Sequence, residues 1–152
     1  MIKFQNSISI EVPIEKAFDF IAGPENFPHW NYYLKSVTKI SEGETMLGAR
    51  FHQIRKQDEQ VFEITQFEQY KLIELTTLPK ANLYAKRLIV FSTTGQGTQI
   101  EDFFELDSGH PSFLQKLFVG KTKRAIKENL DKLKELLETG YSTLQDGRIS
   151  RI

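Results

Sequence analysis

The feature that most constrains the fold of this chain is one long amphipathic segment near its C-terminal end, residues 112–137. Apolar side chains recur along the segment at intervals of three or four residues, which predicts an α-helix with one apolar face. They are Phe113, Leu114, Leu117, Phe118, Ala125, Ile126, Leu130, Leu133, Leu136 and Leu137. Ser112 and Gln115 have the spacing of a capping box, and Gly140 follows as a helix-ending glycine. Such a helix would be about 38 Å long. Its apolar face cannot stay in water, so a broad surface must cover it.

The chain before this helix consists mainly of short runs in which apolar and polar side chains alternate, as in strands with one buried face. The runs are residues 2–12, 37–41, 48–56, 60–67, 71–77, 83–94 and 99–106. Short turns separate most of them, which favours antiparallel neighbours. Two short helices, at residues 14–22 and 24–27, are predicted between the first two runs. The sequence therefore predicts an α+β fold, in which a curved seven-stranded antiparallel sheet, with two short helices after its first strand, wraps around the long C-terminal helix.

The length of the chain, 152 residues, fits a single domain, which we place at residues 1–138. Residues 139–152 form a polar tail without a periodic pattern, and we expect it to fray or to dock loosely. No signal peptide and no apolar run of membrane-spanning length is visible. The expectation is a cytoplasmic protein without an integral membrane segment, either a monomer or a dimer.

The charge balance argues against nucleic acid as a partner, because the 20 basic and 20 acidic residues cancel. There is one local exception inside the long helix, a basic run without any acid until Glu128. The run contains Lys116, Lys121, Lys123, Arg124 and Lys127. A solvated helix face is the favoured interpretation of this run, and a patch that binds an anion or RNA is the alternative.

Metal and cofactor sites are not expected. The chain has no cysteine, which excludes disulfides, thiolate catalysis and cysteine metal ligands. His29, His52 and His110 lie far apart in the sequence and lack the spacing of metal ligands.

Asp102 and Arg87 are the candidate catalytic residues. Asp102 lies between Ile100 and Phe104 on the apolar face of its strand. A buried carboxylate is unfavourable unless it is paired or neutral, and in a dry pocket it can act as a general acid or base. Arg87 could hold a ligand carboxylate or polarise a carbonyl group. An ion pair of Asp102 with Arg87 or Arg50 is the structural alternative, as is an exposed Asp102. Since Lys86 precedes Arg87, the pattern also leaves open which face of this strand is buried.

Several segments resemble the START-like helix-grip (SRPBCC) superfamily, and most closely its polyketide cyclase/dehydrase-like branch. Residues 8–21 resemble its strand-into-helix opening, and residues 23–30 its second helix followed by a tryptophan. Residues 47–51 resemble its glycine-marked third strand, and residues 123–138 its closing helix. The resemblance implies a helix-grip fold over residues 2–138. Members of the superfamily bind hydrophobic ligands, transfer lipids, cyclise polyketides or dock protein partners, so the resemblance specifies the fold better than the activity.

A strongly bent sheet cannot pack its whole concave face against one helix, and the remaining gap is a place for a small ligand. The ligand-binding candidates are bulky or apolar residues of the sheet, the long helix and the loop after the short helices. They are Trp30, Phe51, Phe62, Ile64, Tyr84, Leu88, Val90, Phe104, Leu117 and Phe118. For Trp30 and Tyr84 a structural role is the favoured interpretation, and contact with a ligand is the alternative.

The sequence leads to three hypotheses about function. The first is binding of a small hydrophobic or amphipathic ligand of the lipid, polyketide or quinone type. The second is a cyclase/dehydrase-type enzyme that uses Asp102 and Arg87. The third is a regulator that acts through protein partners.

Overall fold

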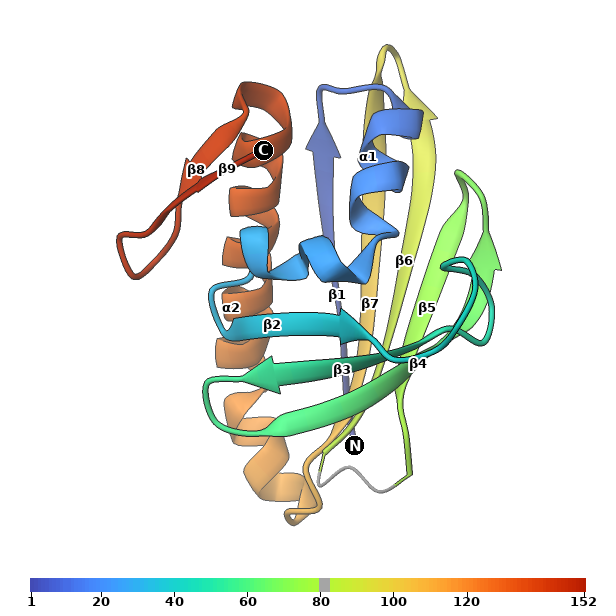
Figure 1. Ribbon diagram of the computed structural model, residues 1–152. Helices are drawn as coiled ribbons and strands as arrows, with labels where there is room; N and C mark the ends of the chain where they lie inside the picture. The colour runs from blue at the N-terminus through green and yellow to red at the C-terminus, as the bar shows by residue number, and fades with distance from the viewer. Residues whose placement is uncertain (80–82) are drawn as a thin grey trace.

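The computed structural model of the protein describes residues 1–79 and 83–152. In this part of the chain the central element is a seven-stranded antiparallel sheet with the spatial order β1-β7-β6-β5-β4-β3-β2 (Figure 1). Its strands are β1 (Ile2–Ile10), β2 (Leu34–Lys39), β3 (Arg50–Arg55), β4 (Glu59–Glu68), β5 (Leu72–Thr77), β6 (Tyr84–Thr94) and β7 (Gly97–Asp107). The helix α1 (Ile14–Ile21) and the 3-10 helix η1 (Pro24–His29) follow β1, and the long helix α2 (Ser112–Thr139) follows β7. The predicted α+β architecture is therefore confirmed.

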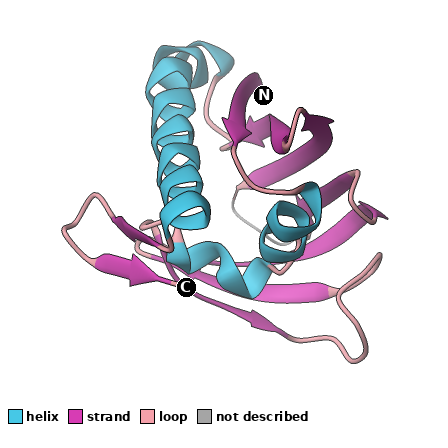
Figure 2. Cartoon of the chain, turned by 90° about the horizontal axis from the view of Figure 1, so that it is seen from above, coloured by secondary structure: helices cyan, strands magenta, loops and turns pink. Residues whose placement is uncertain are grey.

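The sheet is strongly curved. Two register shifts, between Leu34 and Ser36 in β2 and between Ile64 and Gln66 in β4, interrupt the regular pairing. Such irregularities bend a strand and increase its twist. In the view of Figure 2 the strands form an arc, and α2 lies on the open side of that arc. The helix packs along β1, the edge strand.

The apolar face of α2 is covered along its second half, and most of its first half is not. Leu130, Leu133, Leu136 and Leu137 are buried in a core shared with α1 and the concave face of the sheet. Phe113 and Leu117, in contrast, are 67% and 72% exposed. The prediction that the sheet covers the whole apolar face is thus wrong for the first turns. The sheet is wider than the helix can fill there, and a space remains between them.

The capping box predicted at the start of α2 does not form. Pro111 occupies the N-cap position and Ser112 is already helical, without a side-chain capping hydrogen bond. Gln115 instead bonds the preceding loop: its Nε2 donates to the carbonyl oxygen of His110 at 2.6 Å, and its Oε1 accepts from the amide of Ser108 at 3.3 Å. At the other end Gly140 adopts a left-handed conformation with φ of 86°, as predicted for a terminating glycine.

The C-terminal tail is ordered, which corrects the expected fraying. It forms a hairpin of β8 (Tyr141–Thr143) and β9 (Ile149–Arg151) that packs against α2. Leu144 is buried, and Gln145 Nε2 donates to Oδ1 of Asn129 on the helix at 3.1 Å. The guanidinium of Arg148 donates to the carbonyl oxygen of Pro28 at 3.0 Å. These contacts join residues far apart in the sequence, and periodicity does not reveal such contacts.

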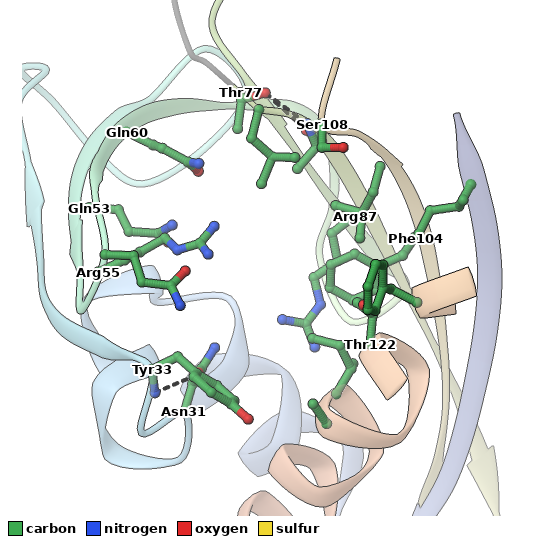
Figure 3. A pocket seen from close by; sticks show the side chains of 18 of the residues that line it. Asn31, Tyr33, Gln53, Arg55, Gln60, Thr77, Arg87, Phe104, Ser108 and Thr122 are labelled. Atoms are coloured by element: carbon green, nitrogen blue, oxygen red, sulfur yellow. Dashed lines mark hydrogen bonds between the residues drawn. The ribbon is translucent and has the colours of Figure 1, made fainter. Parts of the chain in front are cut away.

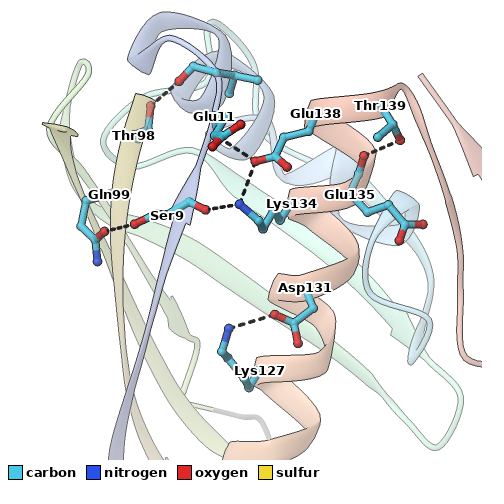
Figure 4. Close-up of polar contacts among 11 residues, drawn as sticks. Ser9, Glu11, Thr98, Gln99, Lys127, Asp131, Lys134, Glu135, Glu138 and Thr139 are labelled. Atoms are coloured by element: carbon cyan, nitrogen blue, oxygen red, sulfur yellow. Dashed lines mark hydrogen bonds and ion pairs between the residues drawn. The ribbon is translucent and has the colours of Figure 1, made fainter. Parts of the chain in front are cut away.

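A polar contact at the end of α2 is expected to make the stability of the fold depend on pH. The carboxylate of Glu138 accepts hydrogen bonds from the backbone amide of Glu11 at 2.7 Å and from Nζ of Lys134 at 2.8 Å (Figure 4). Burial by itself raises the pKa of Glu138, but the hydrogen bond from Glu11 and the ammonium of Lys134 outweigh it and lower the pKa below its ordinary value of 4.5. The contribution of Glu138 to stability is therefore present above about pH 4.5 and is lost as the pH falls through the lower pKa of the folded state.

We expect Glu138→Gln to lower the thermal midpoint at pH 7 and to flatten the decline of that midpoint between pH 5 and pH 3. The loss at pH 7 should be about 1 kcal/mol or less, because the ion pair is partly exposed. Thermal unfolding followed by circular dichroism measures both effects. Glu135→Gln, one turn earlier on α2, removes a carboxylate without these hydrogen bonds. If both variants show the same acid profile, the assignment of the effect to Glu138 is wrong.

Candidate functional site

A cavity of about 720 Å³ lies between the sheet and the first half of α2. Its volume is within the range of sites for small organic ligands. Its apolar lining comes from β1, η1, β2, β4–β7 and α2, together with the segment before β6. These residues are Ile2, Phe27, Leu34, Phe62, Leu75, Leu83, Ala85, Phe104, Leu106, Leu114, Phe118, Ala125 and Ile126. The cavity is thus the space that the curvature of the sheet leaves beneath the uncovered helix turns.

Polar groups interrupt this apolar lining. They are Asn31, Tyr33, Gln53, Arg55, Gln57, Gln60, Thr77, Arg87, Ser108, His110, Gln115, Lys121 and Thr122. The residues that line the cavity include the cations Arg55, Arg87 and Lys121, and no carboxylate occurs among them in the part of the chain that the structure describes. Figure 3 shows Arg55, Gln53 and Gln60 on one wall and Arg87 with Phe104 on the opposite wall. Hydrogen-bond donors therefore lie on both sides of the space.

Arg87 is held in one orientation by three neighbours. Its Nε donates to Oδ1 of Asp102 at 2.9 Å, and its Nη2 donates to Oδ2 at 2.7 Å, which makes a bidentate ion pair. The guanidinium carbon also lies 4.6 Å from the ring centroid of Phe104 and 5.2 Å from that of Trp30. Since the pair occupies adjacent strands β6 and β7 on the concave side, the sheet itself sets its position.

The pairing leaves donors of Arg87 free for a ligand. A guanidinium carries five N–H groups, and Asp102 accepts only two of them. The remaining N–H groups have no partner in the hydrogen bonds of the described residues, and Arg87 lines the cavity. The side chain of Asp102, with no exposed surface, does not line it. Arg87 is thus placed to touch a ligand oxygen, whereas Asp102 positions Arg87.

The ion pair with Arg87 is one of the alternatives that the sequence left open for Asp102. A direct acid–base role of Asp102 is not supported by this placement, because its carboxylate has no contact with the cavity.

Two further polar groups shape the site. The pKa of Tyr33 is raised to about 12, first by a hydrogen bond with Tyr32 and then by burial. Gln60 is largely buried, and its amide nitrogen has no hydrogen-bond partner among the described residues. A buried amide without a partner is unfavourable. A ligand in the cavity can supply the missing hydrogen-bond acceptor if the amide group of Gln60 turns toward the ligand.

Four of the predicted site residues line the cavity: Phe62, Arg87, Phe104 and Phe118. Tyr84, Leu88 and Val90 do not. They lie on the outer face of β6, because the buried positions of this strand are Arg87, Ile89 and Phe91 and side chains alternate between faces. The prediction included residues from both faces of β6, and only one face can line one cavity.

Trp30, Phe51, Ile64 and Leu117 are also placed outside the lining. Trp30, Phe51 and Ile64 are core residues; Phe51 stacks on Phe62 at 5.4 Å between ring centroids, and Trp30 contacts Arg87 from the core side. Leu117 is exposed and does not line the cavity. The cavity lies along the first half of α2, and α1 packs against the other end of the concave face.

Apart from Arg87, the polar lining residues were missed by the sequence prediction, although strand alternation gives a signal for several of them. Gln53 shares a strand face with the buried Phe51, and Gln60 shares one with Phe62, so alternation alone places both inside. The same alternation places His52 on the outer face of β3, where its Nε2 lies 2.8 Å from Oε2 of Glu59. Asn31 and Tyr33 lie in a connection without periodicity and gave no such signal.

Residues 1–79 and 83–152 contain no group of three or more His, Cys, Asp or Glu side chains that could hold a metal ion. Within the same ranges, no helix has both the length and the apolar character needed to cross a membrane.

A curved antiparallel sheet that grips a long C-terminal helix around an internal cavity defines the helix-grip class of α+β proteins. The sequence model of the family "Polyketide cyclase / dehydrase and lipid transport" matches residues 1–138. The chain belongs to this family. A search of curated protein sequences gives no match.

Solved structures support the same fold. TTHA0849 from Thermus thermophilus is similar with a TM-score of 0.73 and 14% identity, covering 90% of this chain and 97% of its own. The Aha1 dimer from Colwellia psychrerythraea has a TM-score of 0.67 and 16% identity, covering 92% and 98%. Ara h 8.0201 has a TM-score of 0.59 and 14% identity, covering 90% and 97%. At these identities the likeness concerns the fold alone.

Proposed function

We propose that the protein is a cytoplasmic binding protein for a small hydrophobic or amphipathic molecule of the lipid, polyketide or quinone type. The ligand occupies the cavity between the sheet and α2, and Arg87 donates hydrogen bonds to one of its oxygens. The observation that carries this proposal is the apolar cavity of about 720 Å³ with the fixed guanidinium of Arg87 in its wall. Membership of a family described by polyketide cyclase, dehydrase and lipid transport supports it.

The lining selects for certain ligand chemistry. Apolar surface favours a hydrophobic body, and the donors of Arg87 favour a carbonyl or carboxylate oxygen at one end. A ligand with a cationic end would face Arg55, Arg87 and Lys121 without a carboxylate in the described lining. We therefore expect oxygen-bearing hydrophobic molecules to bind and amines of the same size to bind weakly.

Filling the cavity should abolish binding. Ala125→Trp places a large side chain into the cavity from α2, since Ala125 is one of the lining residues. We expect binding of oleate and of a short-chain ubiquinone, measured by isothermal titration calorimetry, to fall by at least about 10-fold, because the ligand and the indole compete for the same volume. Organic extraction of the purified protein followed by mass spectrometry identifies any molecule that co-purifies.

Lys123→Trp is the matched control, because it adds the same side chain to an exposed position of the same helix. It should leave binding unchanged. If Ala125→Trp binds both probes as tightly as the unmodified protein, the cavity is not the binding site.

An enzyme of the cyclase/dehydrase type is the second candidate function, and one observation favours it. N–H groups fixed before the substrate arrives can stabilise the negative charge that develops on an enolate oxygen, and Arg87 presents such groups. In that case Arg87 contacts the substrate, Asp102 keeps the guanidinium in place, and the acid or base must be another group. Turnover of a polyketide-type substrate that Arg87→Met combined with Asp102→Leu abolishes would favour this candidate over simple binding.

A further inference from the structure

The first half of α2 exposes apolar side chains on a face beside the one that lines the cavity. Leu114 and Phe118 line the cavity, but Phe113 and Leu117 do not and are 67% and 72% exposed. Phe113 and Leu117 are four residues apart and therefore neighbours on one helix face. Two large apolar side chains side by side in water are unfavourable and indicate a surface that contacts something else.

The same helix segment is strongly basic. Between Ser112 and Lys127 the sequence contains five basic residues and no acid; the basic residues are Lys116, Lys121, Lys123, Arg124 and Lys127. Lys127 pairs with Asp131 at 2.9 Å, and none of the other four takes part in an ion pair formed by the described residues. Arg124 lies seven residues after Leu117, on the same stripe, and Lys116 and Lys121 flank that stripe. The exposed face thus combines an apolar pair with uncompensated positive charge.

This combination distinguishes between possible occupants. A second copy of the chain packed on the same face would bring two clusters of cations together, which is repulsive. RNA would satisfy the charges but would leave the aliphatic Leu117 without an apolar partner. An anionic lipid surface satisfies both features, because its phosphates attract the cations and its acyl boundary accepts apolar side chains.

We propose that the first half of α2 docks on the surface of a membrane that contains anionic lipids. Phe113 and Leu117 enter the interfacial region, and Lys116 and Arg124 contact the lipid phosphates. Because Leu114 and Phe118 on the adjacent side of the same helix line the cavity, docking brings the rim of the cavity next to the lipid surface. The contact is peripheral and goes beyond the ligand binding proposed above.

The test is sedimentation of the full-length protein with vesicles of phosphatidylcholine alone or with about 30% phosphatidylglycerol. We expect binding to the anionic vesicles only, and release at about 0.5 M salt, where charges are screened within a few ångströms. Lys116→Gln combined with Arg124→Gln should weaken binding about 30-fold, since each cation near the surface contributes about 1 kcal/mol, or about fivefold. Phe113→Ser combined with Leu117→Ser should weaken it at least about 10-fold.

Leu47→Ser is the control, because Leu47 is also exposed but lies in the connection before β3, outside the basic segment. It should leave vesicle binding unchanged. None of the four substituted positions lines the cavity, so the binding of oleate measured by calorimetry should persist in both double variants. The two proposals can therefore fail separately.

Equal binding to neutral and anionic vesicles, or no binding to either, overturns the docking proposal. A dimer seen by light scattering and removed by the Phe113→Ser and Leu117→Ser changes would assign the face to a second copy instead. Binding of RNA that depends on Lys116 and Arg124 but not on Phe113 and Leu117 would also overturn it.

Discussion

Replacing Asp102 by alanine is expected to lower the free energy of unfolding by about 3–5 kcal/mol, because it leaves a buried arginine without its counter-charge. The carboxylate of Asp102 has no exposed surface and accepts both of its hydrogen bonds from Arg87 at 2.9 and 2.7 Å. Without it, Arg87 stays wedged between the rings of Phe104 and Trp30 and cannot reach bulk water easily. Urea unfolding measures the loss, and Trp30, the single tryptophan, reports it by fluorescence.

The control for this prediction is Glu105→Ala on the same strand. Glu105 pairs with Lys3 at 3.3 Å on the outer face of β7, where both side chains are partly exposed. Its removal should change the free energy of unfolding by less than about 1 kcal/mol. If Asp102→Ala lowers the free energy of unfolding no more than Glu105→Ala does, the ion pair does not stabilise the sheet. Arg87 is then solvated or pairs with another group.

The fold could be predicted from the sequence because most of its elements show one of two periodic patterns of apolar residues, that of a strand or that of a helix. Alternation in β1 and β7 and the three-to-four residue spacing in α2 are local patterns, and each marks one face of an element for burial. The order of elements and the short connections then leave few arrangements, and the helix-grip arrangement is the one observed.

The face of β6 that lines the cavity could not be predicted from the strand alone. Leu88 and Val90 are as apolar as Ile89 and Phe91, so alternation gives two equivalent solutions. The partner strand decides between them. In the observed register Ile89 lies opposite Asp102, which places Arg87 diagonally across from the carboxylate on the same face. The ion pair thus turns Arg87 inward and Leu88 outward, and this information is not local.

The limits of the apolar stripe on α2 have a similar cause. Periodicity shows that Phe113 and Leu133 both belong to apolar positions of a helix, but it does not show what covers each turn. Leu133 is buried in the core, whereas Phe113 lies in a helix turn that the sheet does not cover and is exposed. The cavity and the exposed face both follow from the curvature of the sheet, which is a property of the whole fold.

The second large effect is expected for the double change Arg87→Met with Asp102→Leu. Replacing a buried ion pair by apolar side chains of similar volume is often close to neutral for stability, so we expect urea unfolding within about 1–2 kcal/mol of the unmodified protein. The affinity for oleate should nevertheless fall about 10- to 100-fold, because a hydrogen bond from a charged donor to the ligand contributes about 1.5–3 kcal/mol. Isothermal titration calorimetry measures the affinity on a protein whose fold is intact.

The double change separates the contribution of the ion pair to stability from the contact of Arg87 with the ligand. The single variant Asp102→Ala cannot separate them, because it would lose stability and ligand binding together. Arg50→Met with Glu63→Leu is the matched control: this pair joins β3 and β4 at 3.4 Å, and neither residue lines the cavity. Its affinity for oleate should not change. If the Arg87→Met and Asp102→Leu protein binds oleate as tightly as the control, the ligand oxygen does not contact the guanidinium. Ala125→Trp would then still report whether the ligand occupies the cavity, so the orientation of the ligand and its location are tested independently.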